Sequence, residues 1–209
     1  MKTDGIILDV DGTIWNSTGI VADAWNKAAI DMEADYDTIS AEMLKAYFGK
    51  TMEEIAAGLF SRVEPEKRHK LMRLCERYEQ EYLQKDECHI VYEGVKETIA
   101  ALSKKVKIFV VSNCQKGYIE LMLEKTGMEK YVTDTECYGN TGNGKADNIR
   151  LLAERNSLKA PLYVGDTDGD AIACEKAGVP FIFASYGFGN TEKYVEKISK
   201  FEKLTEIID

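Results

Sequence analysis

Short apolar runs that end in polar or acidic side chains constrain the fold of this chain more than any other feature. The runs are rich in Val, Ile and Phe and show little alternation, as is typical of parallel strands buried on both faces. They occupy residues 5–10, 106–112, 161–166 and 180–185. Either of two weaker segments, Tyr131–Thr133 or Glu136–Tyr138, is a further strand candidate.

Helical patterns lie between these runs and predict how the strands are connected. Apolar residues at helical spacing, with Gly127 and Gly178 as stop signals, place helices over residues 93–105, 116–125, 145–156 and 168–177. Alternation of strand and helix predicts an α/β fold, a doubly wound, Rossmann-like parallel sheet.

The segment that follows the first strand differs from the rest of the chain. It shows helical patterns over residues 21–32, 40–48, 51–60 and 65–85, and no strand pattern. We therefore expect a core of residues 1–14 and 87–209 with an all-helical cap of residues 15–86 inserted into it. Hinges are expected near 13–17 and 86–93. The many charges of the helix over 66–85 are interpreted as a solvated outer face, and Trp15 and Trp25 as packing residues.

Charge excludes several classes of partner. The chain has 36 Asp and Glu against 27 Lys and Arg, a formal net charge of -9, which disfavours binding to nucleic acid or to an anionic membrane surface. No apolar run approaches the roughly 20 residues that span a membrane. Five scattered cysteines without a Cys-x-x-Cys pair indicate reduced thiols and a cytoplasmic location.

Two acidic clusters follow predicted strands. Asp9 and Asp11 come at the end of the first run, and Asp166, Asp168 and Asp170 come at the end of the third. Because the carboxyl ends of parallel strands meet at one edge of a sheet, the clusters are expected to converge on a hard cation such as Mg²⁺. Alternatively, the first cluster is a solvated loop and Asp168 only an N-cap. The spacing of both clusters fails that of an EF-hand.

Two further segments suit phosphate binding. Gly139–Ala146 fits a P-loop except at its last position, where Ala146 replaces the required Ser or Thr, so we expect Lys145 to reach a phosphate from a helix N-terminus instead. A plain Gly/Asn-rich connection is the alternative. Ser112 and Asn113 end the second run, where they either hold phosphate oxygens or cap the next helix.

Four elements in order resemble the haloacid dehalogenase superfamily of phosphotransferases, and the resemblance covers essentially the whole chain. They are Asp9-Val10-Asp11-Gly12-Thr13, Ser112, Lys145, and Gly165-Asp166-Thr167-Asp168-Gly169-Asp170. The helical insert resembles the first cap type, as in phosphoglycolate-phosphatase-like and β-phosphoglucomutase-like members.

The resemblance implies roles for these residues. Asp9 is the nucleophile that forms an aspartyl-phosphate, and Asp11 is the general acid and base. The implied ligands of Mg²⁺ are Asp9, the backbone carbonyl of Asp11, and Asp166, with Asp170 or Asp168 as the further acid of the last motif. Ser112, Asn113 and Lys145 are the implied phosphate ligands, and Lys125 or Lys130 would replace Lys145 if it lies elsewhere.

We therefore expect a Mg²⁺-dependent phosphatase acting on a small phosphorylated metabolite, as a monomer or weak homodimer. In caps of this type a short loop covers the substrate. In this chain we expect that loop to be Phe48–Thr51, with Lys50 and Thr51 as candidate contacts to the leaving group. Asp11 favours phosphate esters over dehalogenase or phosphonatase chemistry, and Thr13 favours a hydrolase over a mutase. A sugar-phosphate mutase and a non-catalytic phosphometabolite sensor are the alternatives.

Overall fold

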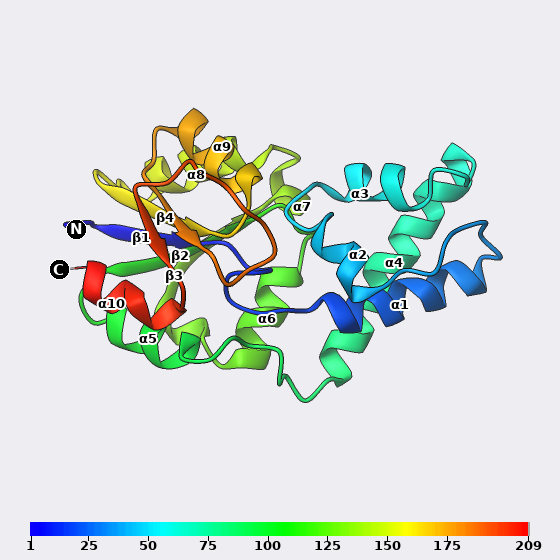
Figure 1. The fold of residues 1–209 in the computed structure, drawn as a ribbon, viewed down its shortest axis with the longest axis horizontal. Coiled ribbons are helices and arrows are strands. Elements are labelled where there is room, and N and C mark those ends of the chain that lie inside the picture. The colour runs from blue at the N-terminus through cyan, green and yellow to red at the C-terminus, as the bar shows by residue number, and fades with distance from the viewer. Residues whose placement is uncertain (209) are drawn as a thin grey trace.

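A parallel sheet forms the centre of the computed structural model, which describes residues 1–208 (Figure 1). Its strand order is β3-β2-β1-β4-β5-β6, and every neighbouring pair is parallel. The strands are β1 Gly5–Leu8, β2 Lys107–Ser112, β3 Val132–Cys137, β4 Pro161–Gly165, β5 Phe181–Ala184 and β6 Glu196–Ile198. The expected α/β doubly wound fold is confirmed. The strand β3 takes in residues of both weaker candidates, whereas β6 was missed because it is short and mostly exposed.

Helices cover both faces of the sheet (Figure 1). Ile6 and Leu8 of β1 pack with α5 Val95–Leu102, α6 Tyr118–Thr126 and α10 Leu204–Ile207, whereas Ile7 packs with α8 Lys145–Arg155 and α9 Asp168–Ala177. Successive side chains of a strand point to opposite faces, so both sets must be apolar. This arrangement explains the continuous apolar runs. The short elements are η1 Glu129–Tyr131, α7 Tyr138–Thr141 and η2 Phe201–Lys203.

The strand order reverses direction at β1. The chain proceeds from β1 to β2 and β3 on one side, then crosses to β4, β5 and β6 on the other. The carboxyl ends of β1 and β4 therefore lie at the switch point, where open α/β sheets bind their ligands.

The helical insert lies beyond this carboxyl edge, at the end of the molecule opposite the two termini (Figure 1). Its helices are α1 Thr18–Asp31, α2 Ala41–Lys45, α3 Met52–Leu59 and α4 Pro65–Lys85, close to the four expected ranges. They share a hydrophobic cluster, separate from those of the sheet, in which Trp25, Phe60 and Leu71 are fully buried.

The two segments that connect the insert to the sheet lie side by side. Trp15 forms an antiparallel bridge with Val91, and Asn16 N donates to Ile90 O at 2.8 Å. Lys125 Nζ donates to the carbonyls of Gln84 and Asp86 at the end of α4, at 2.8 and 2.5 Å. This contact places Lys125 at the connection and not at the carboxyl edge of the sheet.

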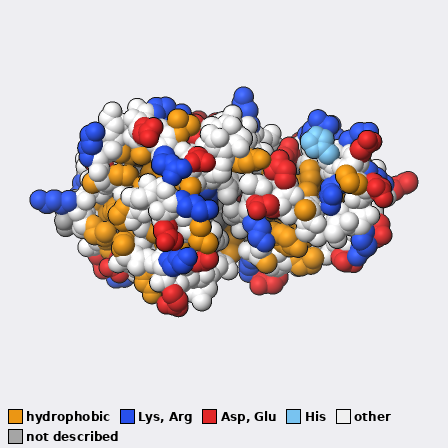
Figure 2. All heavy atoms as spheres, turned by 90° about the horizontal axis from the view of Figure 1, so that it is seen from above, with side chains coloured by type: hydrophobic (Ala, Val, Ile, Leu, Met, Phe, Trp, Pro, Cys, Tyr) orange, Lys and Arg blue, Asp and Glu red, His pale blue; other side chains and the backbone are white. Residues whose placement is uncertain are grey.

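Charges of both signs are interspersed over the face seen in Figure 2, so the net charge of -9 does not produce one acidic surface there. Among the described residues, none of the helices combines the length and the apolarity that crossing a bilayer requires.

We expect Leu71→Ala to lower the free energy of unfolding of the insert by about 2–5 kcal/mol, because it opens a cavity among the packed helices. Urea unfolding followed by tryptophan fluorescence measures this change. Ile30→Ala is the matched control: Ile30 lies in α1 with 63% of its surface exposed, so its loss should change stability by less than about 0.5 kcal/mol. Equal effects of the two substitutions would contradict the packing described.

Candidate active site

A tight turn after β1 shapes the carboxyl edge of the sheet. The carbonyl of Val10 accepts hydrogen bonds from the amides of Thr13 and Ile14, at 3.2 and 2.7 Å. Gly12 has a φ of +79°, and a Cβ at this position would lie 2.1 Å from Asp166 Oδ2. Only glycine combines this backbone conformation with so close an approach, so Gly12 lets the ends of β1 and β4 meet.

Three buried carboxylates converge at this point. Asp9 follows β1, Asp166 follows β4, and Asp170 lies in the first turn of α9. One oxygen of each lies within 4.8 Å of the others. The structure therefore brings together three of the four acids proposed as metal ligands. The side chain of the fourth, Asp11, lies outside this group.

Lys145 is the cation of the cluster and the first residue of α8. Its Nζ lies 2.5 Å from Asp170 Oδ1 and 3.0 Å from Asp9 Oδ1, and only 4% of the side chain is exposed. Burial alone would lower the pKa of Lys145, but the carboxylates of Asp170 and Asp9 outweigh it and raise the pKa above its usual value. The ammonium group therefore stays charged.

One ammonium against three carboxylates leaves two negative charges uncompensated in a buried site. Burial, reinforced by the neighbouring acids, raises the pKa of Asp9 to about 7 and that of Asp166 well above its usual range. Among the described residues, Asp166 Oδ1 is buried without a hydrogen-bond partner, and the contact of Asp9 Oδ1 is with the shared ammonium group of Lys145. The carboxylate oxygens of this cluster, its excess negative charge and its unsatisfied oxygen all fit a hard divalent cation. Such a cation would stabilise the ionised acids.

Asp170 is held more tightly than the other two acids. Its Oδ2 accepts hydrogen bonds from the amide and hydroxyl of Thr167, at 3.0 and 2.7 Å, and from the amide of Asp166 at 3.2 Å. Thr167 is the N-cap of α9, so the interpretation of Asp168 as the N-cap is wrong. Asp168 instead accepts a hydrogen bond from Thr191, and Asp170 is the acid that joins the cluster.

Asp11 is fixed through one of its two oxygens. Asp11 Oδ1 accepts hydrogen bonds from Trp15 Nε1, Ser17 Oγ and Tyr118 OH, at 3.0, 2.7 and 2.8 Å. Burial raises the pKa of Asp11 to about 6, although these hydrogen bonds oppose the rise. The three hydrogen bonds leave Oδ2 unused, and Asp11 lines a cavity. Trp15, interpreted from the sequence as packing only, also orients this acid.

Ser112 and Asn113 end β2 beside the acidic cluster. Asn113 Nδ2 donates to the carbonyl of Gly49 in the helical insert at 2.8 Å, while its Oδ1 is buried without a partner among residues 1–208. The helix α6 begins only at Tyr118, after Gly117 as N-cap. The alternative in which Ser112 or Asn113 caps this helix is therefore wrong.

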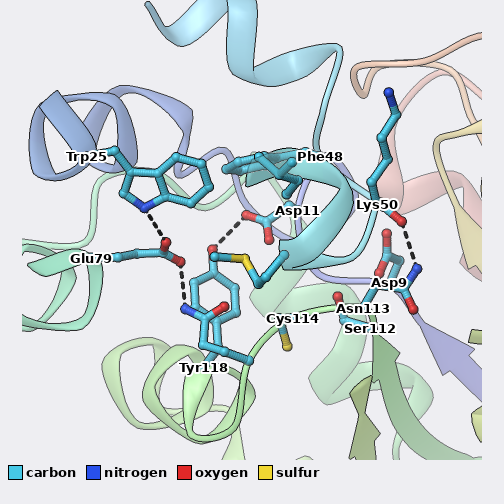
Figure 3. A pocket seen from close by; sticks show the side chains of 14 residues that line it. Asp9, Asp11, Trp25, Phe48, Lys50, Glu79, Ser112, Asn113, Cys114 and Tyr118 are labelled. Carbon is cyan, nitrogen blue, oxygen red and sulfur yellow. Dashed lines mark hydrogen bonds between the residues drawn. The ribbon is translucent and has the colours of Figure 1, made fainter. Parts of the chain in front are cut away.

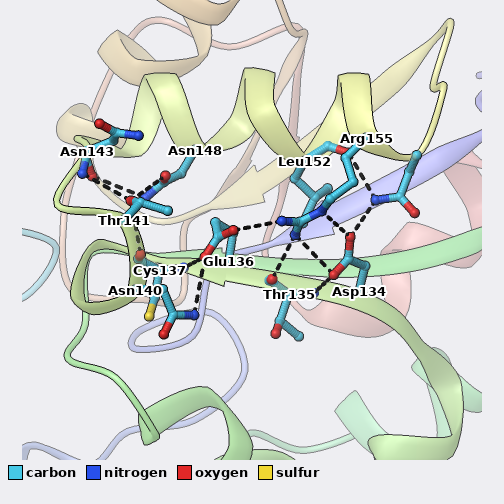
Figure 4. Close-up of polar contacts among 11 residues, drawn as sticks. Asp134, Thr135, Glu136, Cys137, Asn140, Thr141, Asn143, Asn148, Leu152 and Arg155 are labelled. Atoms are coloured by element: carbon cyan, nitrogen blue, oxygen red, sulfur yellow. Dashed lines mark hydrogen bonds and ion pairs between the residues drawn. The ribbon is translucent and has the colours of Figure 1, made fainter.

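The position of Lys145 depends on how α8 is fastened to β3 (Figure 4). Near the end of the helix, Arg155 binds Asp134 with two nitrogens at 2.8 and 3.0 Å and Glu136 at 2.9 Å. Near its start, Asn148 Oδ1 accepts from Thr141 Oγ1 at 2.8 Å. The end of α8 is thus held to β3, and its start is held to Thr141 of α7.

A cavity of about 420 Å³, open solvent at its mouth included, lies between the sheet edge and the insert (Figure 3). Asp9 and Asp11 line it from the sheet side, and Phe48 and Lys50 line it from the loop between α2 and α3. Phe48 also makes an edge-on contact with Phe188 of the core, with ring centroids 6.0 Å apart. This loop therefore closes over the carboxyl edge.

The two candidate substrate contacts of this loop point elsewhere. Lys50 Nζ lies over the ring of Tyr47, 4.9 Å from its centroid, and points away from Asp11 in Figure 3. Thr51 is the N-cap of α3, and its hydroxyl is bonded to Glu54. The structure does not bring either polar group to the acidic cluster. Lys130, the other replacement considered for Lys145, lies over the ring of Tyr131.

Glu79 of α4 lines the same cavity and was missed in the sequence. It is 4% exposed, and its carboxylate accepts hydrogen bonds from Trp25 Nε1 at 2.8 Å and Gln115 Nε2 at 2.9 Å. Burial, aided by the charge of Asp11, raises its pKa to about 8. The charged helix is therefore not simply a solvated face. Glu79 lies four residues from both Cys75 and Leu83, and therefore on the same buried face of α4. This spacing is the signal in the sequence that could have predicted its burial.

Comparison with known proteins gives consistent matches. The model of the family described as "Haloacid dehalogenase-like hydrolase" matches residues 6–184. A phosphoglycolate phosphatase of Pseudomonas syringae pv. syringae is 27% identical over 121 residues, which are 56% of this chain and 44% of the relative. This chain thus spans under half the length of that curated relative.

Two solved structures share the fold. A predicted phosphoglycolate phosphatase from Haemophilus somnus superposes with a TM-score of 0.85 at 21% identity, covering 98% of this chain and 97% of the other. CbbY from Rhodobacter sphaeroides, solved in complex with xylulose-(1,5)bisphosphate, has a TM-score of 0.79 at 17% identity and covers 97% of this chain and 96% of its own.

We expect Gly12→Ala to disrupt the cluster, because the added methyl group would collide with the Asp166 carboxylate and the residue would keep a positive φ. Differential scanning fluorimetry should show a lower Tm and a smaller shift on addition of Mg²⁺. Gly19→Ala, in the first turn of α1 with no atom within 4 Å of the new Cβ, is the control and should be neutral or slightly stabilising. An unchanged Mg²⁺ shift in Gly12→Ala would contradict the geometry.

Glu79 should make stability fall as pH rises. Its pKa in the folded chain, about 8, is above the ordinary 4.5, so the native state retains a proton that the unfolded state releases. Relative to Glu79→Gln, the wild type should therefore lose unfolding free energy between about pH 4.5 and 8, on the order of 1.4 kcal/mol per unit of pKa shift. Urea titrations of both proteins across this range measure the difference; a pH-independent difference would show that Glu79 has an ordinary pKa.

Proposed function

The chain belongs to the haloacid dehalogenase-like hydrolase family, and on this premise we propose that it is a Mg²⁺-dependent phosphatase of a small phosphorylated metabolite. One observation carries the proposal. Asp9 lies in a buried cluster that carries excess negative charge, and Asp11, two residues further on, is held by one oxygen with the other left for proton transfer.

Asp9 acts as the nucleophile in this proposal. One of its carboxylate oxygens forms a bond to phosphorus as the bond from phosphorus to the ester oxygen breaks, giving an aspartyl-phosphate and an alcohol. Asp11 donates the proton that the departing oxygen needs. Asp11 then takes a proton from the water that attacks the aspartyl-phosphate, which releases phosphate and regenerates Asp9.

The charge of the transferred group is matched by groups from one helix and from the end of one strand. Lys145 Nζ, 3.0 Å from Asp9 Oδ1, lies where it can neutralise a phosphoryl oxygen next to the nucleophile. Ser112 and Asn113 provide a hydroxyl and backbone amides on the other side of Asp9. Stabilisation of equatorial charge is the main requirement of phosphoryl transfer, so this side of the site supplies positioning and charge.

Mg²⁺ would be held by Asp9 and Asp166: Asp166 Oδ1 is buried without a hydrogen-bond partner among the described residues, and Asp9 shares the ammonium group of Lys145 with Asp170. The carbonyl of Asp11 is a further proposed ligand. Asp170 would act chiefly by orienting Lys145 and the loop after β4, because both its oxygens already accept hydrogen bonds. When bound, the ion supplies charge neutralisation for the phosphoryl group and for the carboxylates around it.

The insert serves as a cap in this proposal, with residues 15–86 moving relative to the core about the paired connecting segments. The loop carrying Phe48 and Gly49 closes the cavity, so opening is needed for substrate entry. The relatives carry the name phosphoglycolate phosphatase, which makes phosphoglycolate one ester to test. We expect the protein to act in the cytoplasm, as a monomer or weak homodimer; its five cysteines are all free thiols.

A sugar-phosphate mutase is the second candidate, because one structural neighbour was solved with a bisphosphate. A mutase needs a bisphosphate activator and retains the phosphate in its product. Release of free phosphate from a monoester without activator would exclude the mutase. A non-catalytic sensor would bind such an ester without releasing phosphate.

We expect Asp9→Asn to abolish phosphate release from an aryl phosphate in Mg²⁺, because the amide cannot act as the nucleophile. The wild type should release phosphate only with Mg²⁺ and should stop on chelation. Circular dichroism should show that the variant is folded, since it also removes one charge from a crowded acidic site. Asp23→Asn, an exposed acid of α1, is the control and should keep full activity. Full activity in Asp9→Asn would contradict the proposed mechanism.

A further inference from the structure

Glu79 is a buried acid that the proposed reaction does not use. It comes from α4 of the insert and lines the cavity that also contains Asp9 and Asp11. Its two hydrogen bonds come from neutral groups, the indole of Trp25 and the amide of Gln115. Among residues 1–208, no cationic side chain lies within ion-pair distance of it. A buried acid without a counter-ion keeps its proton, and a cation bound beside it would lower its pKa from about 8 and favour the ionised form, so its presence in a ligand cavity calls for an explanation.

The charges around Glu79 are negative. Asp11 is the nearest acid on the sheet side, and its charge contributes to the high pKa of Glu79. Lys50 is the only lysine or arginine in the described lining, and its Nζ lies over Tyr47 and points away from the cavity (Figure 3). Lys145 is occupied by Asp9 and Asp170. A ligand in this part of the cavity therefore meets carboxylates without an opposing ammonium or guanidinium group.

The walls next to Glu79 are aromatic. Trp25 contacts Glu79 directly, and Phe48 and Tyr118 line the same cavity. Figure 3 shows the Trp25 indole beside Glu79, with its ring extending towards Phe48. Aromatic side chains combined with a carboxylate favour organic cations, because the ring faces and the acid both attract positive charge.

We propose that the leaving group of the substrate carries a cationic nitrogen that binds beside Glu79, so that the substrates are phosphate monoesters of small amino alcohols. This inference rests on the proposed phosphatase function and specifies its substrate class. The cation supplies the counter-charge that Glu79 lacks in the protein. An ester whose leaving group carries a carboxylate, such as phosphoglycolate, places that carboxylate beside Glu79 and Asp11 without a cationic side chain to balance it and is disfavoured.

Three esters of similar size distinguish the effect of charge from that of shape. Phosphoethanolamine carries an ammonium group on its leaving group. At the same position 2-hydroxyethyl phosphate is neutral and 2-phosphoglycolate carries a carboxylate. Phosphate release in Mg²⁺ gives kcat/KM for each. For the wild type we expect phosphoethanolamine to exceed 2-hydroxyethyl phosphate by about tenfold or more, and phosphoglycolate to be the poorest of the three. A wild-type ranking with phosphoglycolate first, or no preference for the ammonium ester, overturns the proposal.

Glu79→Gln tests the residue itself. We expect the ratio of kcat/KM for phosphoethanolamine to that for 2-hydroxyethyl phosphate to fall about tenfold or more, towards one. Glu81→Gln changes an exposed acid two residues further along the same helix, whose partner is Arg77, and should leave the ratio unchanged. An unchanged ratio in Glu79→Gln overturns the proposal. If that variant does not fold, the wild-type ranking decides.

Failure of this inference is distinguishable from failure of the proposed function. Mg²⁺-dependent hydrolysis of an aryl phosphate without preference for the ammonium ester contradicts the substrate class and leaves the phosphatase intact. Absence of hydrolysis of every ester, the aryl phosphate included, contradicts the phosphatase and with it the inference.

Discussion

The ion-pair contacts of Lys145 with Asp9 and Asp170 are the interaction on which the rest of the site depends. Three carboxylates from separate segments converge there, and without an ammonium group between them their repulsion would oppose the convergence itself. The ammonium group occupies this place because α8 starts at Lys145, and the helix is fastened to β3 by Arg155 and to Thr141 of α7 by Asn148. Exposed ion pairs such as that of Arg155 contribute little stability individually. Their importance here is the position that they give to a buried charge.

The segment after β2 contacts both the insert, which closes over the sheet edge, and Asp11 at that edge. Asn113, at the end of β2, holds the carbonyl of Gly49, and Gln115, two residues later, holds the carboxylate of Glu79. Tyr118 of the following helix donates to Asp11. The segment after β2 therefore contacts the loop, the helix α4 and Asp11 at once. Displacement of the insert would break the first two contacts, whereas Tyr118 and Asp11 both lie outside the insert.

Most of the fold could be predicted from the sequence, because apolar runs and helical spacing report burial directly. The clear strands, the helices around them and the helical insert follow from those patterns, and the acids at strand ends follow from parallel topology. The strand β6 could not be predicted, since an exposed edge strand of three residues has almost no apolar signal. The role of Glu79 depends on contacts with residues brought near by tertiary folding, whereas Thr167 and Trp15 contact acids only three and four positions away in the chain. Glu79 bonds Trp25, 54 positions away, and charge in a helix indicates solvent exposure far more often than a ligand cavity.

The antiparallel pairing of the connecting segments at Trp15 and Val91 has a consequence for how this molecule can vary. The chain leaves the core and returns to it at adjacent points. The core therefore fixes only the short distance between these two points, whatever the number of residues in the insert. The entropy of closing such an excursion grows only slowly with its length. A longer, shorter or unrelated set of helices can therefore be exchanged at this junction while the sheet and its carboxylates stay as they are. The carboxyl edge of the sheet and the insert that covers it can in this sense vary separately within one chain.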